Sequence, residues 1–464
     1  MMESVIPGES RIPYQSRIFC NRNLRLDRIR FVGFDMDYTL AIYTEAMEHL
    51  QSEMVLERLV EAFGYGHEVT QAKYQPGFAI RGLAVDKAHG NVFKMDAHRF
   101  VGRVWHGEAP LDKESRKEIY TNRMISPADP SIVMVDTLFA LPEISLYCQL
   151  VAHYESLPED VSRPTWDRLW NDLRAAMDSL HRDGTLKARI LADIPTYIQQ
   201  DPNLAETLHR FRSAGKRLFI VTNSEPHYTE AIMAYLLDGA HPAYPRWRDF
   251  FEVVVTSAMK PMFFSSEDPL QEVLEDGTFS DAPLTSLRRG TLYVGGNAAE
   301  LSRLAGFQGD DVIYVGDHIY GDILRSKRTT SWRTAMIVPE MDTELQHIVN
   351  HGPALEELEE LEETRFQLDL DRAAVPRNGQ RSHELKDLVR GINQQIARLE
   401  GSIADGFNQA WGPLFRDRAE LSAFGAQVED YACVYTGRVS NFRFYSPFWY
   451  FRSPRDRMAH ELRR

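Results

Sequence analysis

Two aspartates, Asp35 and Asp37, stand just after a short apolar run, Ile29 to Phe34. Like charges this close repel each other, which favours protonation of one carboxyl group at neutral pH. One carboxylate can then act as a nucleophile while its neighbour acts first as an acid and then as a base. Two acids that cap a helix would give the same sequence pattern, so the pair alone does not establish a catalytic role.

Further polar residues follow apolar runs in the same way. They are Thr222 and Asn223 after Leu218 to Val221, Lys260 after Phe250 to Val255, and Asp317 and Asp322 after Val312 to Val315. A hydroxyl, an amide and main-chain N–H groups at a helix start suit a phosphate, and a lysine offsets its charge. Carboxylates suit Mg²⁺. Each group alone is a weak signal, but four groups in order at strand ends predict a phosphoryl-transfer site.

Buried parallel strands are the elements that must position these groups. The four runs and a fifth, Arg333 to Val338, are apolar throughout, which is typical of strands covered on both faces. A helix-like segment from Asn203 to Ala214 lies between two of them. Alternation of strands and helices predicts a doubly wound α/β fold, in which ligands bind at the carboxyl ends of the strands.

The spacing of the runs predicts three parts. The stretch between the first two strands is far longer than a crossover helix needs, so it must hold an inserted domain. We expect a catalytic core from residues 1–44 and 211–345, a mixed α and β insertion over 45–210, and a helical C-terminal extension over 346–464. The extension contains an a/d repeat (Leu385, Val389, Ile392, Ile396, Leu399, Ile403). This repeat predicts either a coiled-coil seam that joins subunits or a long helix packed on its own domain.

Composition excludes several classes. The 464 residues include 53 Lys and Arg against 67 Asp and Glu, a net charge of −14, which argues against a nucleic-acid coat. Three separated cysteines form neither a disulfide framework nor a CxxC metal site. The N-terminus lacks the apolar stretch of a secretory signal, and no run is long enough to span a membrane. We therefore expect a soluble, cytoplasmic protein that binds neither nucleic acid nor membranes.

The strand-end motifs resemble those of the haloacid dehalogenase (HAD) superfamily of phosphotransferases. FDMDYTL at 34–40 resembles the first motif, DxDxT, and Thr222, Lys260 and GDHIYGD at 316–322 resemble the other three. The resemblance extends to the cytosolic purine 5′-nucleotidases of type II, which prefer IMP and GMP. The similar segments are RGLAVD at 81–86, GN at 90–91, DTLFALPE at 136–143, VTNS at 221–224, KPMFF at 260–264 and GDHIYGDIL at 316–324.

This resemblance implies a HAD-like Rossmannoid core with an inserted cap, and a Mg²⁺-dependent 5′-nucleotidase of purine metabolism. Asp35 would attack the 5′-phosphorus to form an aspartyl-phosphate. Asp37 would protonate the leaving 5′-oxygen and then activate water. Lys260 would offset charge in the transition state, and Thr222 and Asn223 would bind the phosphate.

The metal and the partners are implied in the same way. The Asp35 carboxylate, the Asp37 main-chain carbonyl and Asp317 would hold Mg²⁺. Asp322 would either lie beside the metal or orient Lys260. The resemblance also implies phosphate transfer to nucleosides, allosteric activation by nucleotides such as ATP and GTP, and a homo-oligomer, either a tetramer or a dimer. Tyr320 matches an aromatic residue near the family's effector site, and a packing role is equally compatible.

Base recognition is assigned by the resemblance to residues of the insertion. Phe139 corresponds to an aromatic residue that stacks on the purine, and the matching recognition positions are Arg174, Asp178, His181 and Lys187. Three of these, at 174, 178 and 181, share one helical face by their spacing. Without the resemblance, a solvated helix face would explain them. Ala140 and Arg182 depart from the family pattern, in which asparagine and an aromatic residue are common.

Two alternatives to a purine nucleotidase remain open. One is a HAD phosphatase for another small phosphomonoester, and the other is a catalytically silent nucleotide-binding scaffold. The complete set of Asp35, Asp37, Lys260 and Asp317 argues against the silent scaffold.

Overall fold

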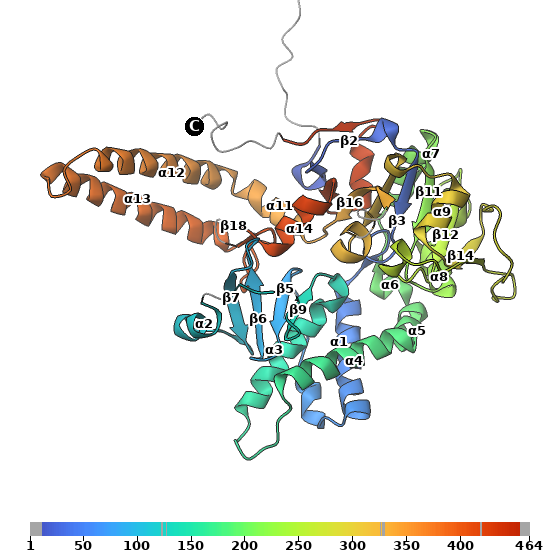
Figure 1. Ribbon diagram of the computed structural model, residues 1–464, viewed down its shortest axis with the longest axis horizontal. Coiled ribbons are helices and arrows are strands. Elements are labelled where there is room, and N and C mark those ends of the chain that lie inside the picture. The colour runs from blue at the N-terminus through green and yellow to red at the C-terminus, as the bar shows by residue number, and fades with distance from the viewer. Residues whose placement is uncertain are drawn as a thin grey trace, which may run out of the picture.

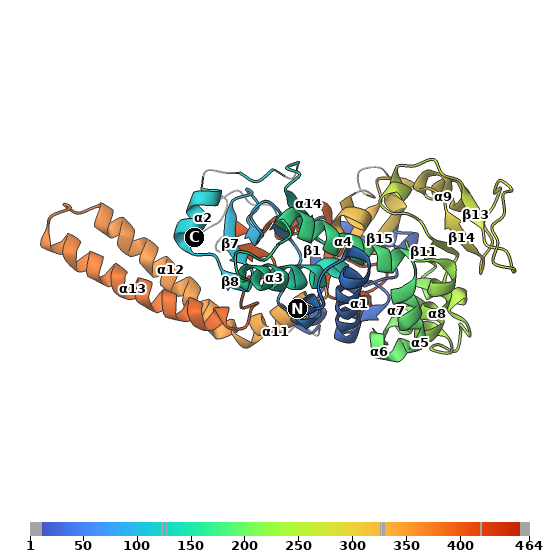
Figure 2. The same cartoon turned by 90° about the horizontal axis from the view of Figure 1, so that it is seen from below.

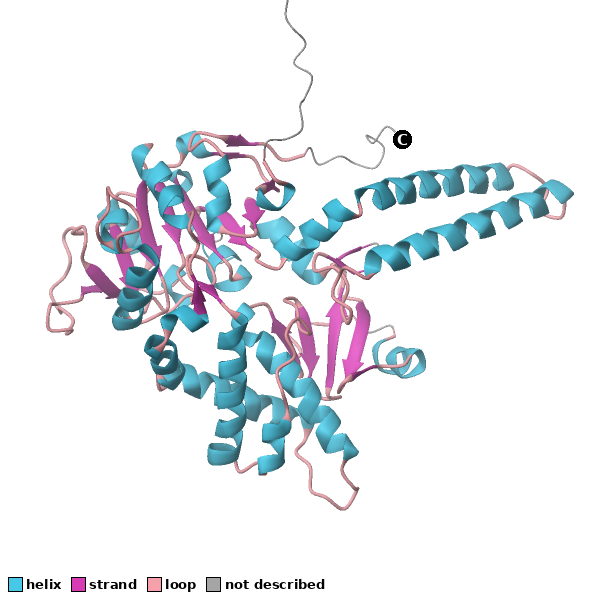
Figure 3. Cartoon of the chain, turned by 180° about the vertical axis from the view of Figure 1, so that it is seen from behind, coloured by secondary structure: helices cyan, strands magenta, loops and turns pink. Residues whose placement is uncertain are grey.

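A computed structural model describes residues 12–121, 124–126, 128–324, 326, 330–417 and 420–454. Its centre is a nine-stranded sheet, in which seven neighbouring strands run parallel and the strand at each edge runs antiparallel to its neighbour (Figures 1 and 3). In spatial order the strands are β1 (Phe19–Cys20), β19 (Val434–Thr436), β16 (Arg333–Ile337), β15 (Val312–Gly316), β3 (Phe31–Phe34), β11 (Arg217–Val221), β12 (Val253–Thr256), β14 (Leu292–Gly295) and β13 (Leu270–Glu272).

The sheet is buried on both faces. Alternate residues of one strand enter two different apolar clusters: Val32 and Phe34 of β3 lie in one, and Phe31 lies in the other. Strands β11 and β15 divide in the same way. The helices outside the insertion include α7 (Leu204–Ser213), α8 (Pro226–Leu237), α9 (Ala298–Ala305), α11 (Met341–Asn350) and α14 (Ala423–Tyr431). The predicted α/β class with a parallel core sheet is therefore confirmed.

All five apolar runs form strands of this sheet, whereas the sequence analysis does not predict β1, β13, β14 and β19. Strand β19 comes from the segment expected to be a helical extension over 346–464, and it pairs with β16 in parallel. The expected helical extension contains α12 and α13, but it also contains this strand, which the sequence analysis does not predict. A three-residue strand is too short to give a periodic signal in the sequence.

A long insertion leaves the core through the two-stranded ribbon of β4 (Ile42–Tyr43) and β10 (Ile198–Gln199). It contains a five-stranded antiparallel sheet with the order β8-β7-β6-β5-β9. These strands are β8 (Ala109–Pro110), β7 (Val101–His106), β6 (Asn91–Met95), β5 (Leu83–Asp86) and β9 (Ile132–Val135). Its helices are α1 (Glu45–Phe63), α2 (Lys113–Tyr120), α3 (Leu141–Ser156), α4 (Trp166–Arg182), α5 (Thr185–Ala192) and α6 (Ile194–Tyr197).

Two long helices, α12 (Gly352–Ala373) and α13 (Gln380–Ala404), form a hairpin that projects away from the body of the molecule (Figures 1 and 2). The a/d repeat lies on α13, where Leu385, Val389 and Ile396 are buried. Because α13 packs along α12, the repeat makes an antiparallel seam within one chain. Short ribbons join β2 (Leu24–Arg25) to β20 (Tyr450–Phe451), and β17 (Arg416–Asp417) to β18 (Glu420–Leu421).

No helix in the described ranges has the length and apolar character needed to cross a bilayer.

The central strand predicts a stability effect. A Cβ atom on Gly33 would lie 2.3 Å from Cζ of Phe219 in the adjacent strand β11, whose ring is buried against Phe307 and Trp332. Gly33→Ala should therefore lower the free energy of unfolding by about 1–3 kcal/mol through overpacking. Urea denaturation monitored by circular dichroism measures this change.

A matched glycine provides the control. A Cβ atom on Gly391 in α13 would meet nothing within 4 Å, so Gly391→Ala should stabilise its helix by up to about 1 kcal/mol. Equal denaturation midpoints for Gly33→Ala and the wild type would contradict the overpacking argument.

Candidate active site

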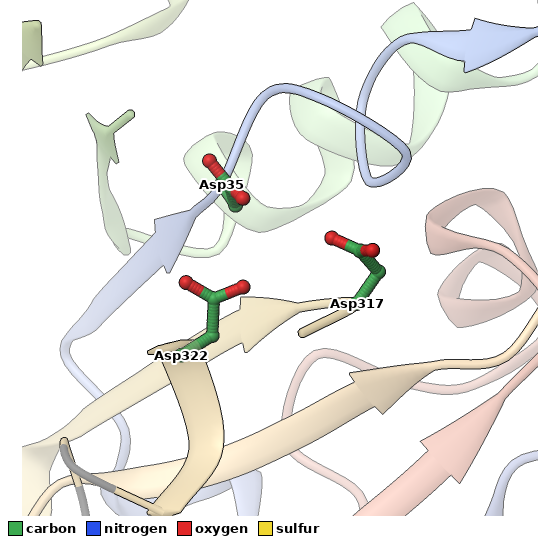
Figure 4. A group of neighbouring side chains, drawn as sticks. All are labelled: Asp35, Asp317 and Asp322. Carbon is green, nitrogen blue, oxygen red and sulfur yellow. The ribbon is translucent and has the colours of Figure 1, made fainter. Parts of the chain in front are cut away.

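The sequence-predicted residues converge at the carboxyl ends of four neighbouring strands. Asp35 follows β3, Thr222 follows β11, Lys260 lies beyond β12 and Asp317 follows β15. Because β15, β3, β11 and β12 are consecutive neighbours in the sheet, their ends meet on one edge. Figure 4 shows the side chains of Asp35, Asp317 and Asp322 on adjoining segments around a common space.

Three buried carboxylates form the centre of this site. Asp35, Asp317 and Asp322 are 8%, 4% and 1% exposed, and each offers one oxygen such that the three lie within 4.8 Å of one another. Buried anions at this spacing need cationic partners. Oxygen ligands of this kind fit a hard divalent cation such as Mg²⁺.

Lys260 supplies one positive charge to the cluster. Its Nζ lies 2.8 Å from Oδ1 of Asp35 and 2.7 Å from Oδ1 of Asp322, and it donates to the hydroxyl of Tyr314 at 3.1 Å. Burial alone would lower the pKa of Lys260, but Asp322 and Asp35 hold that pKa well above its ordinary value. The lysine therefore stays protonated and fixes two of the three carboxylates.

The two acids of the DxD pair have different surroundings. Burial raises the pKa of Asp35 to about 7, against the lowering effect of the Lys260 cation. Asp37 instead accepts hydrogen bonds from two hydroxyls, those of Tyr43 at 2.7 Å and Ser224 at 2.8 Å. One carboxylate thus faces a fixed cation and the other faces neutral donors, which is the asymmetry that a nucleophile and an acid–base partner require.

Burial also raises the pKa of Asp317 well above its ordinary value, with Asp322 and Asp35 adding to the effect. A bound cation would oppose this rise by stabilising the ionised form.

Thr222 and Asn223 lie beside this acid pair. The Thr222 hydroxyl is fully buried and accepts the main-chain N–H of Ser224 at 3.1 Å. The Asn223 amide donates to the main-chain carbonyl of Lys260 at 3.0 Å and accepts its N–H at 2.6 Å. The side chain of Asn223 therefore positions the lysine loop.

Two of the residues expected to recognise the base lie against the Asp37 loop. Phe139 makes edge-to-face contacts with Tyr38 and His181, with ring centroids 4.7 and 5.5 Å apart. Burial, helped by the charges of Lys187 and Arg174, lowers the pKa of His181 to about 4. This imidazole is therefore neutral near pH 7.

The charged candidates are already paired with carboxylates. Arg174 lies 2.8 Å from Glu143 and 3.3 Å from Asp178, whereas Lys187 pairs with Glu225 of the core. Burial raises the pKa of Glu143 to about 7, although Arg174 opposes the shift. Arg174, Asp178 and Glu143 thus form one polar cluster on the insertion.

Tyr320 lines a separate cavity of about 290 Å³. Its other lining residues include Arg99, Asp136 and Gln427, and none belongs to the carboxylate cluster.

Sequence reasoning assigned no role to several residues that shape the site. They are Tyr43, Arg81, Glu143, Ser224 and Tyr314. Ser224, Arg81 and Glu143 lie in segments that resemble the nucleotidases, so the signal was present. Tyr314 lies inside an apolar run, where a packing role is the natural interpretation.

The parallel core sheet with two strand-end aspartates, a buried lysine and a further acidic pair defines a HAD-type phosphomonoester hydrolase. A family model described as the 5′ nucleotidase family matches residues 18–463. A 5′-nucleotidase domain-containing protein of Dictyostelium discoideum is 30% identical over 434 residues, which cover 91% of this chain and 71% of that protein. The chain belongs to the 5′ nucleotidase family.

The solved structures that match the chain are more distant in sequence. A predicted phosphoglycolate phosphatase from Haemophilus somnus is 12% identical, with coverage of 67% of this chain and 86% of that chain and a TM-score of 0.30. A HAD-hydrolase of Bacillus subtilis, solved with bound magnesium, is 13% identical, with coverage of 68% and 91% and a TM-score of 0.23.

The buried charge cluster predicts a pH-dependent stability effect for Lys260→Met. Removal of the lysine leaves three buried carboxylates without their cation, which should cost about 3–5 kcal/mol of unfolding free energy near pH 8. The raised pKa of Asp35 means that its contribution to stability is present at low pH and is lost as pH rises through about 7. Without Lys260 the ionised form of Asp35 is even less stable in the folded protein, so more stability is lost at high pH. The difference in unfolding free energy between Lys260→Met and the wild type should therefore be smaller at about pH 5.5 than near pH 8.

Urea denaturation in EDTA at both pH values measures the effect. Arg217→Met serves as the control, because it removes a partly exposed cation that pairs with Glu252, donates to the Ala305 carbonyl and lies over the Phe31 ring, so its cost should be the same at both pH values. A Lys260→Met deficit that is the same at both pH values would contradict the buried-charge explanation.

Proposed function

We propose that the chain is a Mg²⁺-dependent 5′-nucleotidase that hydrolyses purine nucleoside 5′-monophosphates, with IMP and GMP preferred. The observation that carries this proposal is the asymmetry of the acid pair, in which Asp35 faces the Lys260 ammonium and Asp37 faces two hydroxyls. A phosphomonoester that enters this edge of the sheet meets a nucleophile, an acid and a fixed positive charge together.

Asp35 is the nucleophile of the proposed reaction. Its carboxylate oxygen forms a bond to phosphorus while the bond from phosphorus to the 5′-oxygen breaks, which gives an aspartyl-phosphate. Lys260 holds the Asp35 carboxylate in place and offsets negative charge as it moves onto the phosphoryl oxygens.

Asp37 is the acid and then the base. It gives its proton to the leaving 5′-oxygen, and in the second step it takes a proton from the water that attacks phosphorus and releases Asp35. The Tyr43 hydroxyl has a second neighbour in the Tyr228 hydroxyl at 2.8 Å, so it can turn away from Asp37 without losing every partner. Ser224 and Tyr43 thus hold the carboxyl group, and the Tyr43 hydroxyl can free one of its oxygens for the substrate.

The metal part of the proposal rests on the donor set. The Asp35 and Asp317 carboxylates and the main-chain carbonyl of Asp37 would hold Mg²⁺, which supplies Lewis-acid stabilisation of the phosphoryl oxygens when it is bound. The ion pair between Asp322 and Lys260 favours an orienting role for Asp322. Thr222 and main-chain N–H groups beside Asn223 would bind the phosphate.

The insertion, predicted over residues 45–210 and bounded in the structure by the ribbon of β4 and β10, would act as the cap that recognises the base. Phe139 and neutral His181 offer aromatic surfaces next to the Asp37 loop, and Arg174 with Asp178 offers a donor and an acceptor. A 6-oxo purine presents the complementary acceptor and N1–H donor, whereas adenine would leave these groups unpaired. Lys187, paired with Glu225, completes the proposed recognition set.

Further parts of the proposal concern regulation and assembly. The cavity beside Tyr320 has the volume of a small-ligand site, which supports it as the site for nucleotide effectors such as ATP or GTP. The aspartyl-phosphate would also allow transfer to a nucleoside acceptor in place of water. The projecting hairpin, in which α12 has no buried residue, supports a homo-oligomer, either a dimer or a tetramer.

Phosphate release from IMP, GMP, AMP, UMP and an aryl phosphate tests the chemistry. The wild type with Mg²⁺ should favour IMP and GMP, and EDTA or Asp35→Asn should reduce release by more than about 100-fold, because each removes a part of the reaction centre. Parallel reactions with ATP, GTP or a nucleoside acceptor test activation and transfer. Equal rates on all five substrates would support a general phosphatase, and tight nucleotide binding without release would support the silent scaffold.

The base-recognition assignment predicts a selective loss in Arg174→Leu. We expect kcat/KM for IMP and GMP to fall about 10- to 100-fold, the worth of one charged hydrogen bond, with a smaller loss for AMP. Helix α4 also offers a matched control in Arg168→Leu, since Arg168 pairs with Asp172 at the same i,i+4 spacing as Arg174 with Asp178. Equal losses for IMP and AMP in Arg174→Leu would show that this residue does not read the base.

A further inference from the structure

One arginine of the insertion, Arg81, reaches into the core behind the carboxylate cluster. Its side chain has no exposed surface, and it is among the largest fully buried side chains of the described residues. The guanidinium also lies over the ring of Phe424, 5.0 Å from its centroid. A buried cation of this size needs several fixed partners.

The partners of Arg81 all belong to the core. Its Nε and Nη2 donate to the two carboxylate oxygens of Glu340 at 2.7 and 2.6 Å. Its Nη1 donates to the main-chain carbonyl of Asp317 at 2.6 Å, and Nη2 also reaches the carbonyl of Ile337 at 3.4 Å. Arg81 therefore joins the ends of β15 and β16 to the residue that precedes α11.

The contact with Asp317 matters because of how the three carboxylates are held. Asp35 is fixed by Lys260 and by the N–H of Met36, and Asp322 is fixed by Lys260 and the N–H of His318. Across the described ranges, no hydrogen bond or ion pair reaches a side-chain oxygen of Asp317. Among the contacts of Asp317 in the described residues, the Arg81 guanidinium holds the main-chain carbonyl of this residue rather than its carboxylate.

We propose that Arg81 is a positioning residue for the divalent-cation site, acting through the main chain of Asp317. This inference rests on the proposed function, since it deepens the role given there to Asp317. It also makes the metal site dependent on the insertion, because a residue outside the core sheet completes its support. The planar fork of arginine suits this task, whereas a lysine has no rigid fork to bind a carboxylate and two carbonyls together.

A merely structural anchor would make a different prediction. An anchor between insertion and core would affect the unfolding temperature and the fraction of active protein. A positioning residue would in addition change the affinity for the cation, because partners that orient metal ligands typically contribute 10- to 100-fold to affinity. Metal affinity therefore separates the two roles.

Mn²⁺ binding to the full chain, followed by electron paramagnetic resonance, provides the direct readout. The site-specific signal is the part of the binding that Asp317→Asn removes. In Arg81→Lys its dissociation constant should rise about 10- to 100-fold, and in Glu340→Gln it should rise by a smaller factor. Arg438→Lys is the matched control, because its pair with Asp342 lies near Glu340 and leaves Asp317 untouched.

Kinetics give the second readout. In Arg81→Lys the Mg²⁺ concentration for half-maximal phosphate release should rise by a similar factor, while KM for the nucleotide at saturating Mg²⁺ stays within about 2-fold of the wild type. Saturating Mg²⁺ should restore most of kcat.

A folded Arg81→Lys with wild-type Mn²⁺ affinity would overturn the inference and leave the proposed function standing. Should Arg81→Lys fail to fold, Glu340→Gln decides: unchanged affinity in that variant overturns the inference, and weakened affinity supports it. A wild type that binds no Mn²⁺ and releases phosphate equally in EDTA would remove the proposed metal site, and this inference with it.

Discussion

The site depends on one electrostatic constraint: three buried carboxylates share a single buried ammonium. The Lys260 side chain bridges Asp35 and Asp322, and Asp317 completes the group within 4.8 Å. Ions removed from water are stable only when they are paired and hydrogen-bonded, and one lysine cannot balance three ionised carboxylates. The site therefore favours binding of a further cation or protonation of a carboxylate, and either one would change the charge around Asp35, the proposed nucleophile.

The architecture satisfies this constraint by bringing distant segments to one edge of a sheet. Polar residues follow each of the parallel strands β15, β3, β11 and β12, so adjacent carboxyl ends bring the acids, the hydroxyl and the lysine to the same place. The hydrogen bonds between Asn223 and the main chain of Lys260 then fix the lysine loop. The fold is thus responsible for the proximity, and local hydrogen bonds are responsible for the orientation.

The sequence predicts the strands and the polar residues that follow them because both leave local signals. Each strand is a continuous apolar run, and a polar residue marks its end. The sequence singles out the segment that contains Arg81 but not the contacts of this residue, because its partners Asp317 and Glu340 are 236 and 259 positions away and no local pattern reports such a pairing. Strand β19 was missed for a related reason, because its three residues join the sheet only through the long return of the chain. The roles of the base-recognition residues stay predictions, although the contact of Phe139 with His181 is compatible with them.

The insertion is joined to the core by contacts of unequal strength. On one side the fully buried Arg81 binds Glu340 and two main-chain carbonyls. Separating Arg81 from Glu340 would leave a buried charge unpaired. On the other side Lys187 pairs with Glu225, and their side chains are 16% and 42% exposed, so this pair is more open to solvent than Arg81 and its partners. If Lys187 belongs to the proposed recognition set, a substrate would replace Glu225 as its partner. Under the two proposals, the insertion would then admit a nucleotide at Lys187 while Arg81 keeps its contacts with Glu340 and the main chain of Asp317.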